Sequence, residues 1–138
     1  MKFDLTEIMT NIVDVININK EVVISDSLIE SSNIKKLENV YFKGRIFRDY
    51  ETSLILEGII TGTMILPDDI TLEDTKIDFE SDIEEYIEET LKITKNTIDI
   101  LDLLWQNILV EIPLRIRMKK MLIFILKVMD GDLLLKKS

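Results

Sequence analysis

The chain of 138 residues contains no cysteine and no histidine. Disulfides are therefore excluded, and so are zinc sites built from these residues, Ser-His-Asp triads and imidazole general bases. An enzyme of this composition would have to work with carboxylates, lysines, arginines or hydroxyls. These absences favour a protein that acts by binding, and we predict no catalytic residue, no metal and no cofactor.

The sequence also lacks long apolar runs. Its longest, Met121–Leu126, is far too short to cross a bilayer. The N-terminus shows no basic segment followed by an apolar stretch, so we expect no signal peptide, no membrane partner and a cytoplasmic location. A hydrophobic content of 46% and a charged content of 31% are typical of a globular protein, and the length predicts a single domain over residues 1–138.

Charge is unevenly distributed along the chain, whose net charge is -9. Residues 67–111 hold 3 basic and 14 acidic side chains, whereas residues 112–138 hold 7 basic and 2 acidic ones. An acidic middle and a basic tail therefore form different surfaces. Because nucleic-acid-binding domains are normally basic, this balance argues against broad contact with a phosphate backbone.

Two neighbouring segments carry the clearest strand patterns. In Ser53–Pro67 the even positions are all apolar or glycine and the odd positions are mixed, which predicts a strand buried on one side. Val40–Arg48 alternates in the same way, and only four residues separate the two segments. We therefore predict a β-hairpin.

The remaining segments predict an α+β fold with an antiparallel sheet of four or five strands and two main helices packed on it. Further predicted strands are Val13–Ile24, with an interruption near Asn19 and Lys20, then Lys76–Glu84 and Leu114–Lys120. The predicted helices are Met1–Ile12 and Asn96–Ile112, the second with Asp99 as its N-cap. Ser25–Asn39 is interpreted as a loop with a helical turn at residues 34–38.

Aromatic and basic side chains alternate on one face of the segment Val40–Arg48. This arrangement is one that sheets use to stack bases and hold phosphates. Together with the basic face of the last predicted strand it gives a candidate RNA-binding set of Tyr41, Lys43, Arg45, Arg48, Arg115, Arg117, Lys119 and Lys120. The alternative is that the aromatic rings cover a second layer while the basic groups are solvated.

The segment Lys76–Glu84 alternates strictly, and its outward positions Asp78, Glu80, Asp82 and Glu84 are all acidic. Such a face is a candidate site for binding a basic protein. Alternatively, it is a solvated face that keeps an edge strand from aggregating. A cation site is less favoured because the acidic run lacks the EF-hand pattern. A carboxylate-based hydrolase would need two of these acids to converge in a pocket.

The order of four pieces resembles the YceD family, the large ribosomal RNA subunit accumulation proteins of bacteria and plastids. The pieces are LTEIM, KGRIFRDYETSLILEGIITGTMILP, PDDITLED and IDILDLLWQNILVEIPLRI. The resemblance covers residues 1–118, and residues 119–138 are a divergent tail. Where the family typically has Pro-Cys-x-x-Cys-Leu-Glu, this chain has Asp68 and Thr71 at the cysteine positions, and a further cysteine position falls near Met118.

The resemblance implies a non-enzymatic factor that supports accumulation of large-subunit ribosomal RNA. It also implies the partners, which are that RNA, a pre-ribosomal particle or a ribosomal protein. Any metal held by the family's cysteines could not be held in that way here. The alternative for this chain is a protein-interaction module whose acidic strand face binds a basic ribosomal protein.

Overall fold

The computed structural model describes residues 1–67, 73–113, 125–126 and 129. The predicted α+β fold is confirmed: the main sheet has four antiparallel strands in the order β2-β3-β4-β5, and a second sheet pairs β1 with β6. The strands are β1 Lys2–Asp4, β2 Val15–Glu21, β3 Lys36–Arg48, β4 Leu54–Pro67, β5 Asp74–Tyr86 and β6 Thr97–Asp99. The helices are α1 Thr6–Met9, α2 Asp26–Glu30, α3 Ile87–Thr90 and α4 Leu101–Val110.

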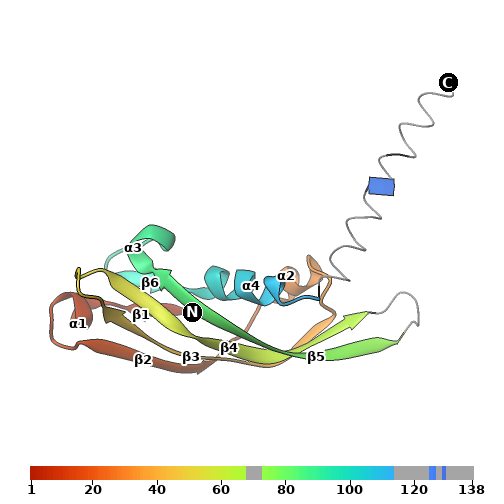
Figure 1. Ribbon diagram of the computed structural model, residues 1–138, viewed down its shortest axis with the longest axis horizontal. Helices are drawn as coiled ribbons and strands as arrows, with labels where there is room; N and C mark the ends of the chain where they lie inside the picture. Colours follow the sequence, from red (N-terminus) through yellow and green to blue (C-terminus); the bar gives the residue numbers. More distant parts are fainter. Residues whose placement is uncertain (68–72, 114–124, 127–128, 130–138) are drawn as a thin grey trace.

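The molecule has two layers, with the main sheet on one side and α4, the short helices and the β1–β6 pair on the other (Figure 1). The core lies between them. The predicted even face of β4 is buried there, and Leu56, Ile60 and Met64 are fully enclosed. Trp105 of α4 packs into the same core, as its apolar stripe predicts. The long β-strands are therefore held mainly by burial of one face, although Ile55 on the other side of β4 is also buried.

The other side of the main sheet, here called the open face, carries the alternate residues of each strand. In Figure 1 the described helices and the β1–β6 pair all lie on the core side and leave this face uncovered. The residues of the open face include Tyr41, Lys43, Arg45 and Phe47 of β3, Ile55, Glu57, Ile59 and Thr61 of β4, and Asp78, Glu80, Asp82, Glu84 and Tyr86 of β5.

A β-bulge in β3 determines which residues reach the open face. The pairing with β4 shifts by one residue between Glu38 and Tyr41, and Asn39 in the bulge has a φ of 53°. A single extra residue reverses the alternation of a strand. Glu38 therefore shares the open face with Tyr41, although the two are three residues apart.

Gly44 and Gly58 lie directly opposite each other on β3 and β4. A Cβ atom on Gly58 would lie 2.6 Å from the carbonyl oxygen of Lys43 and 2.7 Å from the ring of Phe42. The ring of this buried phenylalanine thus fills the space that side chains would take, and glycine is required because backbone atoms occupy the rest.

The predicted strands that lie within the described residues are confirmed, but the interruption near Asn19 and Lys20 is wrong. β2 runs without a break from Val15 to Glu21, in register with β3. Cross-strand hydrogen bonds outweigh the low strand propensity of these two polar residues. The predicted strand Leu114–Lys120 lies outside the described residues.

Both predicted helices, Met1–Ile12 and Asn96–Ile112, are shorter in the structure than expected. Residues 2–4 pair with residues 97–99 as β1 and β6, so the first helix is the single turn α1 and α4 begins only at Leu101. The N-cap of α4 is Ile100, not Asp99, whose carboxylate instead accepts a hydrogen bond from the Leu101 N–H at 3.0 Å. The helical turn expected at residues 34–38 is wrong, since Lys36 already begins β3 and the helix lies earlier, at α2.

In the part of the chain that the structure describes, no helix is both long enough and apolar enough to span a bilayer. Two main helices are expected from the sequence. Among the described helices only α4, with 10 residues, is longer than five residues.

Candidate functional site

The sheet brings the two predicted binding sites onto one surface. Asp78, Glu80, Asp82 and Glu84 lie on β5, the aromatic and basic residues lie on β3, and only β4 separates them. In register across the three strands, the rows are Arg45–Glu57–Glu84, Lys43–Ile59–Asp82 and Tyr41–Thr61–Glu80. With neighbouring strands about 4.8 Å apart, the acidic and basic positions of one row are separated by about 10 Å. The two candidate sites are therefore one mixed surface.

Most of the positive charge on this surface is already paired. The Arg45 Nε atom donates to Glu57 Oε1 at 2.7 Å, and the Arg45 guanidinium lies 4.4 Å from the centre of the Phe47 ring. Lys36 and Lys76 both form ion pairs with Glu38. The Lys36 Nζ atom lies 3.5 Å from Glu38 Oε1, and the Lys76 Nζ atom lies 3.8 Å from Glu38 Oε2. Among the described basic residues of the open face, Lys43 alone has no ion pair.

The negative charge on β5 is not balanced in the same way. Glu80, Asp82 and Glu84 are exposed and form no ion pair within the described residues, while Asp78 accepts a hydrogen bond from the Thr63 hydroxyl at 2.7 Å. Successive carboxylates on one face of a strand are about 7 Å apart. Three like charges at that spacing, without cations, give this edge of the open face a negative potential.

Apolar side chains accompany the acids. Tyr41, Ile59 and Tyr86 are 42%, 39% and 46% exposed, each on the open face. A row of apolar residues also crosses all four strands at one end of this face, formed by Val15, Phe47, Ile55 and Tyr86. Exposed rings and aliphatic groups beside unpaired charges are typical of a protein-binding surface. The strand pattern places Ile59 on the side of the strand opposite the buried face. It does not show that this side is left uncovered, which is what exposes Ile59.

Arg48 has a structural role that separates it from the other predicted RNA contacts. It lies on the core side of β3, opposite Leu54, and its guanidinium donates to the carbonyl oxygens of Thr52 at 2.7 Å and Ile8 at 3.5 Å. It therefore ties the hairpin loop to α1. The candidates Arg115, Arg117, Lys119 and Lys120 lie outside the described residues.

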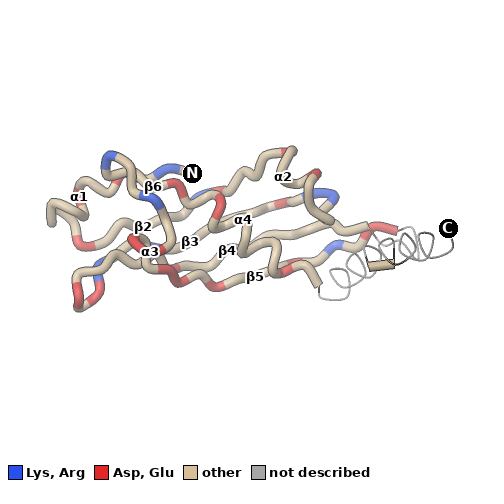
Figure 2. The backbone as a smooth tube through the Cα atoms, turned by 90° about the horizontal axis from the view of Figure 1, so that it is seen from above, with Lys and Arg blue, Asp and Glu red and all other residues tan. Residues whose placement is uncertain are grey.

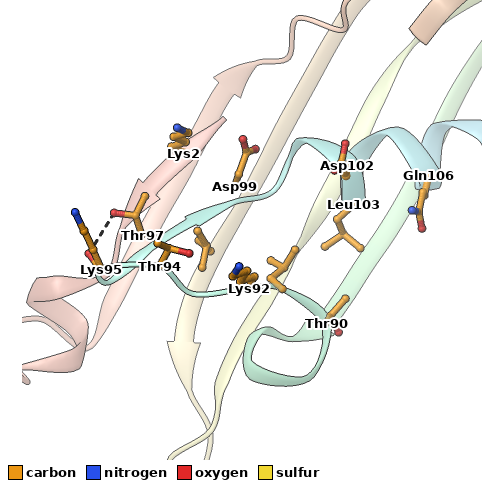
Figure 3. Close-up of a pocket in the computed structure, with 12 residues that line it drawn as sticks. Lys2, Thr90, Lys92, Thr94, Lys95, Thr97, Asp99, Asp102, Leu103 and Gln106 are labelled. Carbon is orange, nitrogen blue, oxygen red and sulfur yellow. Dashed lines mark hydrogen bonds between the residues drawn. The ribbon is translucent and has the colours of Figure 1, made fainter.

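A separate hollow of about 850 Å³ opens on the other layer, between α3, β6 and the start of α4 (Figure 3). Lys2, Lys92 and Lys95 line it together with Asp99 and Asp102. Asp99 is paired with the Met1 amino group at 3.3 Å, and the Leu101 N–H holds the pKa of its carboxyl below 3.8. Charges of both signs at this rim offset one another, and no predicted site residue within the described chain lines it.

The four acids from Asp78 to Glu84 are not arranged as a carboxylate hydrolase would need them. The acids of β5 spread along an open strand instead of converging in a pocket. The carboxyl groups of Asp4 and Asp99 have lowered pKa values, because each accepts hydrogen bonds, Asp4 from Thr6 and Asp99 mainly from Leu101. Neither is thereby tuned to act as a general acid near neutral pH. Within the described residues no group of three or more acidic side chains is placed to hold a metal ion.

Comparison of the chain with protein-family models, with curated proteins and with solved structures finds no match.

Proposed function

We propose that this protein is a non-enzymatic binding module that uses the open face to hold a basic protein partner. The observation that carries the proposal is the row Glu80, Asp82 and Glu84, which is exposed and forms no ion pair with any described residue, beside exposed Tyr41 and Ile59. Three neighbouring like charges on one strand repel one another and do not help it to fold, whereas they would attract a lysine- or arginine-rich surface.

The resemblance to the YceD family supplies the biological setting of the proposal. In that setting the protein acts in the cytoplasm during assembly of the large ribosomal subunit, and the basic partner is a ribosomal protein or a pre-ribosomal particle that displays one. Electrostatic complementarity accelerates encounter and restricts partners, while apolar anchors slow dissociation. Tyr41, Ile59 and Tyr86 are the residues placed to act as those anchors.

Direct binding of ribosomal RNA through Tyr41, Lys43 and Arg45 is the competing proposal. It is less well supported by the surface, because Arg45 is paired with Glu57 and Lys43 faces Asp82 across Ile59. A phosphate backbone approaching these cations would meet the carboxylates of β5 within about one Debye length, 8–10 Å at physiological salt. The partner-recovery experiment described next must therefore distinguish binding of RNA from binding of a protein.

The test is recovery of partners from cells that carry a tagged copy of the chain, with and without ribonuclease treatment. We expect large-subunit ribosomal proteins to be recovered, to survive the ribonuclease and to be lost from a Glu80→Lys/Asp82→Lys variant. A Glu7→Lys/Glu30→Lys variant makes the same change in charge away from the open face and should retain them. Recovery of no ribosomal component, or recovery that ribonuclease abolishes, would contradict the proposal.

A further inference from the structure

Among the described strands, β5 is a free edge of the main sheet. It has 13 residues and pairs there with β4 alone. Figure 2 shows it as the outermost strand along one long side of the molecule. At about 3.3 Å per residue, this edge presents unpaired N–H and C=O groups over about 43 Å.

The opposite edge of the sheet is different. β2 has only 7 residues, and Lys20 of this strand lies over the ring of Phe3 in β1, at 5.1 Å from the ring centre. The open-face positions of β2 are mostly neutral, with Asn17 and Asn19 at its centre. Length and charge both make β5 the edge that is suited to a partner.

The two sides of β5 differ in chemistry. Its open-face positions carry the four acids from Asp78 to Glu84, and its core-side positions Phe79, Ser81 and Ile83 are buried. A strand added at this edge would place one set of alternate side chains directly opposite the acids, with Cβ atoms about 5 Å apart. Its other set would extend the apolar face of the sheet.

We propose that the basic partner adds to β5 as a fifth strand of the sheet, through a segment in which lysine or arginine alternates with apolar residues. The inference rests on the proposed function for the sign of the partner's charge, and it adds the binding mode and the sequence pattern of the partner. Main-chain hydrogen bonds supply affinity, and the alternating side chains supply specificity. Seven residues of such a segment would span Asp78 to Glu84.

The acids on β5 then serve two purposes. Exposed long edges pair readily with one another, and charges on the edge prevent this. A second copy of β5 is repelled by the row of carboxylates, whereas a basic strand is attracted by the same row. The edge thereby remains open to the partner without self-association of the chain.

The test uses a nine-residue peptide of alternating lysine and valine that begins and ends with lysine. One control peptide has the same composition with its five lysines grouped before its four valines. A second control has the alternating sequence with every backbone amide N-methylated, which keeps the charges and removes the hydrogen-bond donors. Affinity is measured by fluorescence anisotropy, and hydrogen exchange of the β5 amides is followed in the full chain.

We expect the alternating peptide to bind at least about tenfold more tightly than either control and to slow exchange of β5 amides but not of β2 amides. The Glu80→Lys/Asp82→Lys variant should lose this binding. Equal affinity of the N-methylated peptide without protection of β5 would overturn strand addition and leave charge-driven binding to the open face intact. Failure of all the peptides to bind, together with failure to bind large-subunit ribosomal proteins, would overturn both proposals.

Discussion

Arg45 and Glu57 lie opposite each other on β3 and β4 and form an ion pair of 2.7 Å on the open face. Glu84 lies on the other side of Glu57 in the same row and forms no ion pair with any described residue. Both partners of the pair are partly exposed, which limits its contribution to stability to about 0–1 kcal/mol. The main consequence of the pair is electrostatic. Arg45, a predicted RNA contact, is occupied by Glu57, and Glu84 beside the pair has no ion-pair partner among the described residues.

The first prediction concerns Arg48. Replacing it with alanine should lower the free energy of unfolding by about 1–3 kcal/mol, because the hydrogen bonds to the Thr52 and Ile8 carbonyls are lost. Denaturant unfolding followed by the fluorescence of buried Trp105 measures this. Lys43→Ala is the control, since Lys43 is exposed and has no ion-pair partner among the described residues, and it should change stability by less than about 0.5 kcal/mol. An Arg48→Ala protein of unchanged stability would show that the guanidinium does not anchor the loop.

The second prediction separates binding from folding on β5. The variant Glu80→Gln/Asp82→Asn removes two neighbouring negative charges that have no cationic partner among the described residues. We therefore expect stability to be unchanged or higher by a few tenths of a kcal/mol. The same variant should bind large-subunit ribosomal proteins more weakly. Thermal unfolding and a binding titration on one preparation give both values. A marked loss of stability would mean that these acids hold the sheet together instead of serving a partner.

The third prediction compares two glycines of β4. Gly58→Ala should cost more than about 2 kcal/mol, because the new Cβ would meet backbone atoms of β3 at 2.6 and 2.7 Å. Gly62→Ala should cost less, since its nearest neighbours are side-chain atoms, Phe79 Cζ at 2.8 Å and Val40 Cγ2 at 3.1 Å. Urea midpoints of the two variants provide the comparison. The reverse order would contradict the close approach of β3 and β4 at Gly58.

The fourth prediction concerns acid pH. The folded chain lowers the pKa of Asp99 below 3.8, chiefly through the hydrogen bond from the Leu101 N–H. A lowered pKa contributes stability that is fully present above pH 3.8 and is lost as the pH falls through the folded value. Asp99→Asn removes this contribution, so the stability difference between the two proteins should be larger at pH 6 than at pH 2.5. A difference that does not change with pH would show that the carboxylate gains nothing from folding.

Much of the sheet could be predicted from the sequence because its strands are long and alternate. The buried face of β4 and the acidic face of β5 follow from period-two patterns, and the hairpin follows from the short connection at Asp49. The pairing of β1 with β6 could not be predicted, because it joins residues 2–4 to residues 97–99 and leaves no local signal.

The site was predictable in its parts but not in its arrangement. The strand patterns place Tyr41 and Asp82 each on an exposed strand face, but they do not show that the two residues share one surface. Their position on one face depends on strand order, which the sequence pattern does not specify. Arg45 is neutralised by its ion pair with Glu57. The strand pattern shows which face of its strand Glu57 occupies, but it does not show that Arg45 lies opposite.

The most direct test of the central claim compares two ligands of the purified chain at low and high salt. The ligands are large-subunit ribosomal proteins freed of RNA and large-subunit ribosomal RNA freed of protein. We predict binding to the proteins that weakens as salt rises, survives Glu7→Lys/Glu30→Lys and disappears in Glu80→Lys/Asp82→Lys. Binding to the naked RNA alone, abolished by Lys43→Ala/Arg45→Ala and unaffected by the β5 variant, would contradict it.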